Sequence, residues 1–129
     1  MGWNVGDTHE TVVVEDLKRT QIVQYAGASG DYNPLHTDEI FATKVAGYPS
    51  VFAHGMLTMG MTGRAVTDLV GADKLVRFGG RFTSQVWPGD TLTVKATVDS
   101  VDDGVVSFAL STVNQDGTEV FSGYAAAKE

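Results

Sequence analysis

The stretch "HGMLTMGMTGRAVTDLVG", from His54 to Gly71, predicts the central element of the fold. Its apolar residues cover more than one face of a helix, which is typical of a helix enclosed by the rest of the domain. They are Met56, Leu57, Met59, Met61, Ala65, Val66, Leu69 and Val70. Gly60 and Gly63 each weaken an isolated helix by about 1 kcal/mol relative to Ala. We therefore expect these glycines to let another backbone or a ligand approach closely.

The part of the chain after this helix has the pattern of strands joined by tight turns. Stretches rich in Val, Thr and Phe, with substantial alternation, cover residues 74–86, 90–103, 105–114 and 118–128. Pro88 and Gly89 suit the central positions of a type II turn, and "DDG" and "QDG" further on indicate hairpins. The pattern predicts an antiparallel meander. Such a sheet, curved around one long central helix, is an α+β architecture, the hot-dog fold.

The part of the chain before the helix is predicted to hold one strand and two shorter helices. "HETVVVE" is short and rich in β-branched residues, as strands are. Asp16 is a plausible N-cap for a helix through "LKRTQIVQYAG", which would end near Gly27 or Gly30. A second helix is expected over "TDEIFATKVAG", with Thr37 or Asp38 as its cap and Gly47 as its stop.

Length and charge narrow the classes of protein to which this chain can belong. Its 129 residues fit one domain, which we place at residues 1–129. The formal net charge of -7 disfavours nucleic acid and anionic lipid as partners. There is no cysteine, so disulfides and thiolate chemistry are excluded. No signal peptide is visible, and Arg64 and Asp68 interrupt the longest apolar stretch, so we expect no membrane span and a cytoplasmic location.

The stretch "YAGASGDYNPLH", from Tyr25 to His36, holds the first candidate for chemistry. Asp31 and His36 lie five positions apart, and a carboxylate and an imidazole that converge on one water form an acid–base pair. Asn33 could orient a water or a ligand, and Pro34 restricts Asn33 to extended conformations. The alternative is ordinary turn chemistry, because Asp, Asn and Pro are common turn residues.

The second candidate is "AHGM", where the central helix begins. The first N–H groups of a helix have no partner within it, and they carry the positive end of its dipole. With Gly55 at this position, a substrate oxygen can come close to a backbone N–H. The alternative is that Gly55 only eases the loop into the helix and that His54 caps or packs.

Other kinds of site find less support in the sequence. His9, His36 and His54 are widely spaced, without a metal-binding pattern, so we expect no metal. No nucleotide-binding motif precedes a helix, and no GxSxG nucleophile motif occurs.

The two candidate stretches, followed by "RFTSQVWPGDTLTV", resemble the MaoC-like (R)-specific enoyl-thioester hydratases and dehydratases from about Tyr25 to Val94. The resemblance implies a hot-dog fold that dimerises, with an acyl tunnel near the subunit interface. It implies that Asp31 and His36 activate the catalytic water, that Asn33 supports them, and that the N–H of Gly55 polarises the thioester carbonyl. The reaction would be syn hydration of a trans-2-enoyl thioester to the (3R)-3-hydroxyacyl thioester, or its reverse, without a cofactor.

The resemblance also raises questions about substrate and partners. His54, Met56, Thr62 and Gly63 would contact the substrate or shape its pocket. An acidic chain suits coenzyme A better than an acidic acyl carrier protein as the carrier. Some members of the family form heterodimers in which one subunit keeps the Asp/His pair, so this chain would be the catalytic partner of a homo- or hetero-oligomer. The alternatives are a hot-dog thioesterase and an acyl-thioester-binding subunit of a larger dehydratase.

Overall fold

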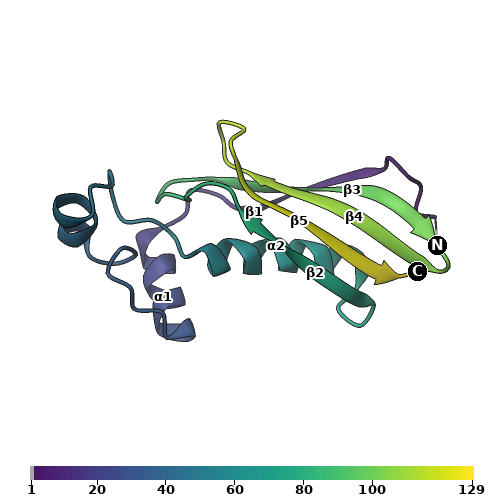
Figure 1. Ribbon diagram of the computed structural model, residues 1–129, viewed down its shortest axis with the longest axis horizontal. Coiled ribbons are helices and arrows are strands. Elements are labelled where there is room, and N and C mark those ends of the chain that lie inside the picture. Colours follow the sequence, from purple (N-terminus) through teal and green to yellow (C-terminus); the bar gives the residue numbers. More distant parts are fainter. Residues whose placement is uncertain (1) are drawn as a thin grey trace.

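A five-stranded antiparallel sheet covers one side of a long helix in the computed structural model, which describes residues 2–129. The strands are β1 (Thr8–Val14), β2 (Leu75–Phe82), β3 (Leu92–Asp102), β4 (Val105–Val113) and β5 (Glu119–Lys128). The helix α2 (Gly55–Val70) runs along the sheet, and the two chain ends lie away from the helix α1 (Arg19–Ser29) (Figure 1). This arrangement confirms the predicted α+β hot-dog fold.

The strand order β1-β3-β4-β5-β2 corrects one part of the predicted topology. Only β3, β4 and β5 form a meander, because β2 pairs with β5 and not with β3. The turn at Pro88 and Gly89 does form, since Gly89 has a φ of 93° and the N–H of Asp90 bonds to the Trp87 carbonyl at 3.1 Å. The turn does not close a hairpin between β2 and β3, because its backbone bonds to another segment of the chain. The N–H of Gly89 bonds to Leu17 O at 2.7 Å, and the N–H of Leu17 bonds to Asp90 O at 2.9 Å.

The helix α2 has one buried face and one exposed stripe. Thr58, Met61, Thr62, Ala65 and Val66 are buried at helical spacing. The residues at every fourth position from Met56 to Asp68, which include Gly60 and Arg64, are exposed instead. Burial on nearly all sides was therefore a wrong expectation for the single chain. A side chain added at Gly60 would meet nothing within 4 Å, so nothing within residues 2–129 uses the space that this glycine leaves.

The sheet packs its alternate residues against α2. Along β3, Leu92, Val94, Ala96 and Val98 are buried, in the period-two pattern of a strand with one covered face. The core also contains a polar contact between α2 and β4, in which the hydroxyls of Thr62 and Thr112 lie 2.7 Å apart. Apolar packing, this polar contact and a hydrogen bond from the Arg64 side chain to Val13 O of β1 at 3.0 Å fix how α2 lies on the sheet.

The helix α1 begins later than predicted, and Asp16 is not its cap. Asp16 has a φ of 52° and forms an exposed ion pair with Lys18. Lys18 occupies the N-cap position without a side-chain hydrogen bond. The positive φ places Asp16 in a turn that precedes the helix, so its carboxylate cannot reach the first N–H groups. At the other end, Gly30 closes the helix with a left-handed φ of 75°, as predicted.

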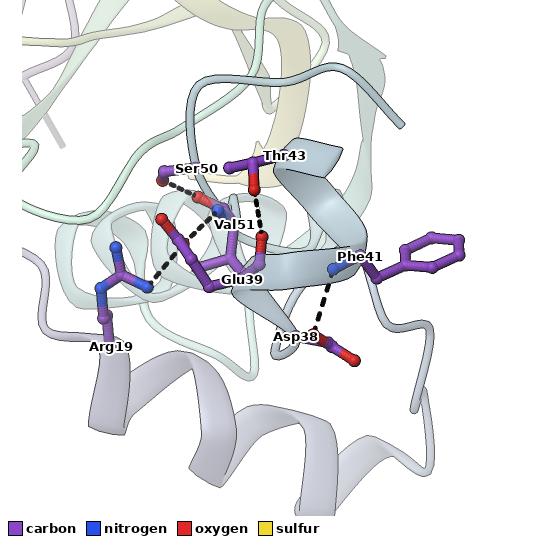
Figure 2. A network of polar contacts seen from close by, with 7 residues as sticks. All are labelled: Arg19, Asp38, Glu39, Phe41, Thr43, Ser50 and Val51. Carbon is purple, nitrogen blue, oxygen red and sulfur yellow. Dashed lines mark hydrogen bonds and ion pairs between the residues drawn. The ribbon is translucent and has the colours of Figure 1, made fainter. Parts of the chain in front are cut away.

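The predicted second helix is a short π-helical segment, η1 (Phe41–Val45). Asp38 accepts a hydrogen bond from the N–H of Phe41 at 3.1 Å, and Gly47 ends the segment with a φ of 81°. Figure 2 shows Glu39 between Arg19 of α1 and the backbone N–H of Val51, at 2.9 and 3.2 Å from its Oε1. Glu39, two residues before η1, therefore ties the start of this segment to α1 and to the residues that lead into α2.

None of the helices within residues 2–129 is both long enough and apolar enough to cross a membrane.

Candidate functional site

The loop after α1 presents Asp31 through a series of short polar turns. Asp31 Oδ1 accepts a hydrogen bond from the N–H of Asn33 at 3.3 Å, and Asn33 Oδ1 accepts one from the N–H of Leu35 at 3.0 Å. The N–H of Asp31 bonds to the hydroxyl of Ser29 at 3.2 Å. These are the hydrogen bonds of ordinary turns, which are the alternative expected from the sequence for this loop. They hold the exposed Asp31 carboxylate in place and leave its Oδ2 without a partner among the described residues.

His36 is buried at the end of this loop, with its ring anchored by a backbone carbonyl. Its Nδ1 lies 2.7 Å from Phe52 O. Because a carbonyl can only accept, this nitrogen carries the hydrogen, and Nε2 is the free nitrogen of a neutral His36. The ring of Phe52 meets the His36 ring edge-on, with 5.3 Å between the centroids. His36 can therefore offer a lone pair at one defined position.

His54 lies against His36 and is only 2% exposed. The two imidazole rings stack with centroids 3.8 Å apart and planes inclined by 25°. Nε2 of His54 lies 3.0 Å from Asp31 O, whereas its Nδ1 is buried without a hydrogen-bond partner in residues 2–129. Burial lowers the pKa of His54, and the hydrogen bond to the Asp31 carbonyl opposes this only in part. His54 is thus a neutral side chain that donates from Nε2 and forms no helix cap.

Gly55 starts α2 next to His54, at the wall of a cavity of about 350 Å³. Its N–H has no acceptor among residues 2–129, as expected for the first turn of a helix. Phe82 lies over it, since a Cβ added to Gly55 would come within 3.0 Å of that ring. Ser84 and Gln85 add polar groups to a lining that is otherwise largely apolar. Asp31 and His36 do not line this cavity, but Phe52 lines it and also contacts His36.

The fold brings Asp31, His36 and His54 together, with one potential ligand atom of each within 4.8 Å of the others. Spacing in the sequence does not show this cluster. Whether it could bind a metal ion depends on how the two imidazole rings are oriented. Stacked rings direct their in-plane lone pairs along nearly parallel planes, and two such nitrogens cannot both reach one ion at about 2.0–2.1 Å. Nδ1 of His36 and Nε2 of His54 are also taken by carbonyls. We therefore do not propose a metal here.

The other residues predicted to contact substrate lie in different surroundings. Thr62 is fully buried; its hydroxyl donates to Thr58 O within α2 at 3.0 Å and lies 2.7 Å from the hydroxyl of Thr112 on β4, and this second contact ties α2 to the sheet. Gly63 faces the ring of Phe78, which would lie 3.2 Å from an added Cβ. Met56 is exposed on the outer stripe of α2. None of the three lines the cavity at Gly55.

Sequence reasoning missed three aromatic residues around the site, namely Tyr25, Phe52 and Phe82. Tyr25 meets the His54 ring edge-on at 4.8 Å between centroids. Phe52 supplies the carbonyl that orients His36 from 16 positions along the chain. A backbone acceptor at that separation leaves no local signal. The quoted stretch does begin with Tyr25, but nothing in its spacing pairs this ring with His54.

Comparisons with known proteins agree on one family. Residues 3–118 match the family model described as "MaoC like domain". Over 94 residues the chain is 38% identical to 3-hydroxyacyl-thioester dehydratase Y of Mycobacterium tuberculosis, which covers 70% of this chain and 32% of that protein. It is 35% identical over 117 residues to the peroxisomal enoyl-CoA hydratase 2 of Arabidopsis thaliana, which covers 88% of this chain and 36% of that one. The chain thus spans about a third of the length of these two relatives.

A solved structure resembles the whole chain. R-hydratase PhaJ1 from Pseudomonas aeruginosa, in its unliganded form, superposes with a TM-score of 0.84 at 28% sequence identity. The match covers 98% of this chain and 81% of that one.

Proposed function

Because the chain belongs to the family of MaoC-like domains, we propose that it catalyses the reversible syn hydration of trans-2-enoyl thioesters to (3R)-3-hydroxyacyl thioesters. The observation that carries the proposal is the meeting of the Asp31 and His36 side chains at His54, the residue directly before Gly55, whose N–H has no acceptor within residues 2–129. Relatives named as a thioester dehydratase, an enoyl-CoA hydratase and an R-hydratase support the same reaction class.

In the proposed reaction, Asp31 and His36 hold one water between the carboxylate and Nε2. The water oxygen forms a bond to C3 of the enoyl thioester while C2 takes a proton on the same face, so the elements of one water are added. The two groups accept and deliver the protons between them. As the C2–C3 double bond opens, negative charge develops on the thioester oxygen, where the N–H of Gly55 would stabilise it.

The carrier and the assembly are part of the proposal. We propose coenzyme A as the carrier, because the chain carries a net charge of -7 and an acyl carrier protein is also acidic. Residues 1–129 would act as one hydratase domain within a homodimer, a higher homo-oligomer or a heterodimer with a related subunit. Complexes of two different subunits, ChsH1-ChsH2 and HadBC of Mycobacterium tuberculosis, occur among proteins of this fold. A cytoplasmic location stays a prediction, since one relative is named peroxisomal.

The proposal is tested with crotonyl-CoA and longer trans-2-enoyl-CoA thioesters, by following the loss of enoyl absorbance. We expect activity in the unchanged chain and a loss of about 10²- to 10⁴-fold in Asp31→Asn and in His36→Gln, because each removes one partner of the acid–base pair. His9→Gln is the matched control, since His9 lies exposed on β1 and contacts Trp3.

The circular dichroism of every variant should match that of the unchanged chain. Full activity in either site variant would remove that residue from the mechanism. Release of free thiol in place of hydration would make the protein a thioesterase, and activity only after a second chain is added would make it one subunit of a heteromeric dehydratase.

A further inference from the structure

We propose that His54 is a positioning residue, which holds the backbone of Asp31 and the ring plane of His36. Its Nε2 lies 3.0 Å from Asp31 O, and its ring stacks on that of His36 with 3.8 Å between centroids. It also precedes Gly55 directly, so its side chain contacts two of the groups that the proposed reaction uses and its backbone leads into the third. The kinetic part of this inference depends on the proposed hydratase function, and the structural part does not.

The hydrogen-bond partner fixes the chemical form of His54. The Asp31 carbonyl can only accept, so Nε2 must carry the hydrogen. Nδ1 then has a lone pair that is buried without a partner in residues 2–129, a situation that proteins usually avoid. Burial also lowers the pKa of the ring, so the side chain remains neutral at pH 7. A neutral ring can lie face to face with His36 without repulsion between two positive charges.

A purely packing role does not account for these contacts. A phenylalanine would fill a similar volume, would stack on His36 and would leave no buried nitrogen without a partner. What phenylalanine cannot supply is the N–H directed at the Asp31 backbone. Asp31 is otherwise exposed and is held by short turn contacts within its own loop. The His54 bond reaches it from 23 positions further along the chain. It therefore anchors the loop to the start of α2.

The position of a catalytic group matters because a misplacement of about 1 Å can lower a rate by about 100-fold. We therefore expect His54→Phe to lower kcat by up to about that factor, with KM changed by less than about threefold, because His54, although predicted to contact substrate, does not line the cavity at Gly55. His54→Gln keeps an N–H near the position of Nε2, so it should recover most of the lost rate. His9→Phe is the matched control and should change neither constant.

Two measurements test the structural part without any substrate. Long-range ¹H–¹⁵N NMR should show the His54 ring neutral at pH 7, with its hydrogen on Nε2. Backbone ¹⁵N relaxation should give Asp31 and Asn33 order parameters near about 0.85 in the unchanged chain and in His54→Gln, and below about 0.6 in His54→Phe.

The outcomes separate the two proposals. An Nδ1-protonated or charged His54, or an equally ordered Asp31 in His54→Phe, would overturn the positioning role. So would hydration by His54→Phe at the unchanged rate. If the unchanged chain does not hydrate enoyl thioesters, the proposed function fails, and the NMR results still decide whether His54 positions Asp31. If His54→Phe does not fold, the tautomer of the unchanged chain and the order of Asp31 in His54→Gln decide.

Discussion

At the scale of single residues, turn chemistry and site chemistry share the same side chains. Asp31 Oδ1 and Asn33 Oδ1 accept backbone hydrogen bonds two residues ahead, which is what Asp and Asn do in ordinary turns. The second carboxylate oxygen of Asp31 has no such partner within the described residues. The two readings of this loop are therefore compatible, because the turn orders the loop and leaves one oxygen available for a water.

The pKa of His54 predicts how stability depends on pH. Burial lowers this pKa below its ordinary value of about 6.5, so between the two values the unfolded chain binds more protons than the folded one. The contribution of His54 to stability is fully present above about pH 6.5 and declines as the pH falls towards the folded-state pKa. Urea unfolding at pH 7.5 and pH 5.5 should show a larger decrease in the free energy of unfolding for the unchanged chain than for His54→Gln.

The comparison is valid only where the dependence of that free energy on urea is the same in both proteins. Only the change in the free energy of unfolding between the two pH values is compared. A loss of stability that the substitution causes equally at both pH values therefore cancels. An equal decrease in both proteins would mean that His54 titrates alike in the folded and unfolded chains.

Residue type and spacing predicted part of the site. The pairing of Asp31 with His36 rests on five positions of separation, and the N–H of Gly55 rests on the start of a helix, so both could be named locally as candidates, although the residues alone left the alternatives open. The role of Phe52 could not, because it acts through a backbone carbonyl, which every residue carries. The stacking of His54 on His36 could not either, since the two lie 18 positions apart and meet only when α2 is placed against the loop.

At the scale of elements, one buried polar contact links α2 to β4. Thr62 donates its hydroxyl hydrogen to Thr58 O, so in the 2.7 Å contact between the two threonines Thr112 must be the donor. Both side chains are fully buried, so neither hydroxyl can bond to water instead. Thr62 is therefore both a donor and an acceptor, whereas Thr112 is the donor to Thr62.

Because the two hydroxyls differ in this way, Thr62→Val and Thr112→Val should lower the free energy of unfolding by different amounts. Thr62→Val leaves the Thr112 hydroxyl as a buried donor without an acceptor and should lower the free energy of unfolding by about 1–3 kcal/mol. Thr112→Val leaves the bond from Thr62 to Thr58 O intact and should cost about 0.5–1.5 kcal/mol. Chemical denaturation of the two variants and of the double variant measures this. Equal losses, or the reverse order, would contradict the assigned direction of the hydrogen bond.

The sequence predicted which segments are helices and strands more completely than it predicted which strands pair with each other. Alternation along the strands and Gly-containing turns are local signals, and every strand predicted from them is present. The pairing of β2 with β5 depends on the path of residues 83–91 across the end of the sheet, which contacts far along the chain determine. Asp16 shows the same limit, because an N-cap residue and a turn residue look alike until φ is known.

At the scale of the whole molecule, the two edges of the sheet differ in their exposed apolar residues. β2 exposes Val76 and Phe82, and Tyr124 of the adjacent β5 is exposed as well. β1, the opposite edge, exposes one large apolar residue, Val12. Phe82 also lines the cavity at Gly55. A second subunit paired along β2 would therefore cover the larger apolar area and would add to the wall of the proposed substrate site.

The expected homodimer can be tested with a pair of matched substitutions. Val76 and Val12 are 53% and 52% exposed on opposite edge strands, so a lysine at either position faces similar surroundings in the single chain. A charge on an edge strand opposes pairing with another chain. Light scattering after size exclusion should give twice the 13.7 kDa chain mass for the unchanged protein and for Val12→Lys, and one chain mass for Val76→Lys. Dissociation by Val12→Lys alone would move the interface to β1, and a monomeric unchanged chain would contradict the homodimer itself.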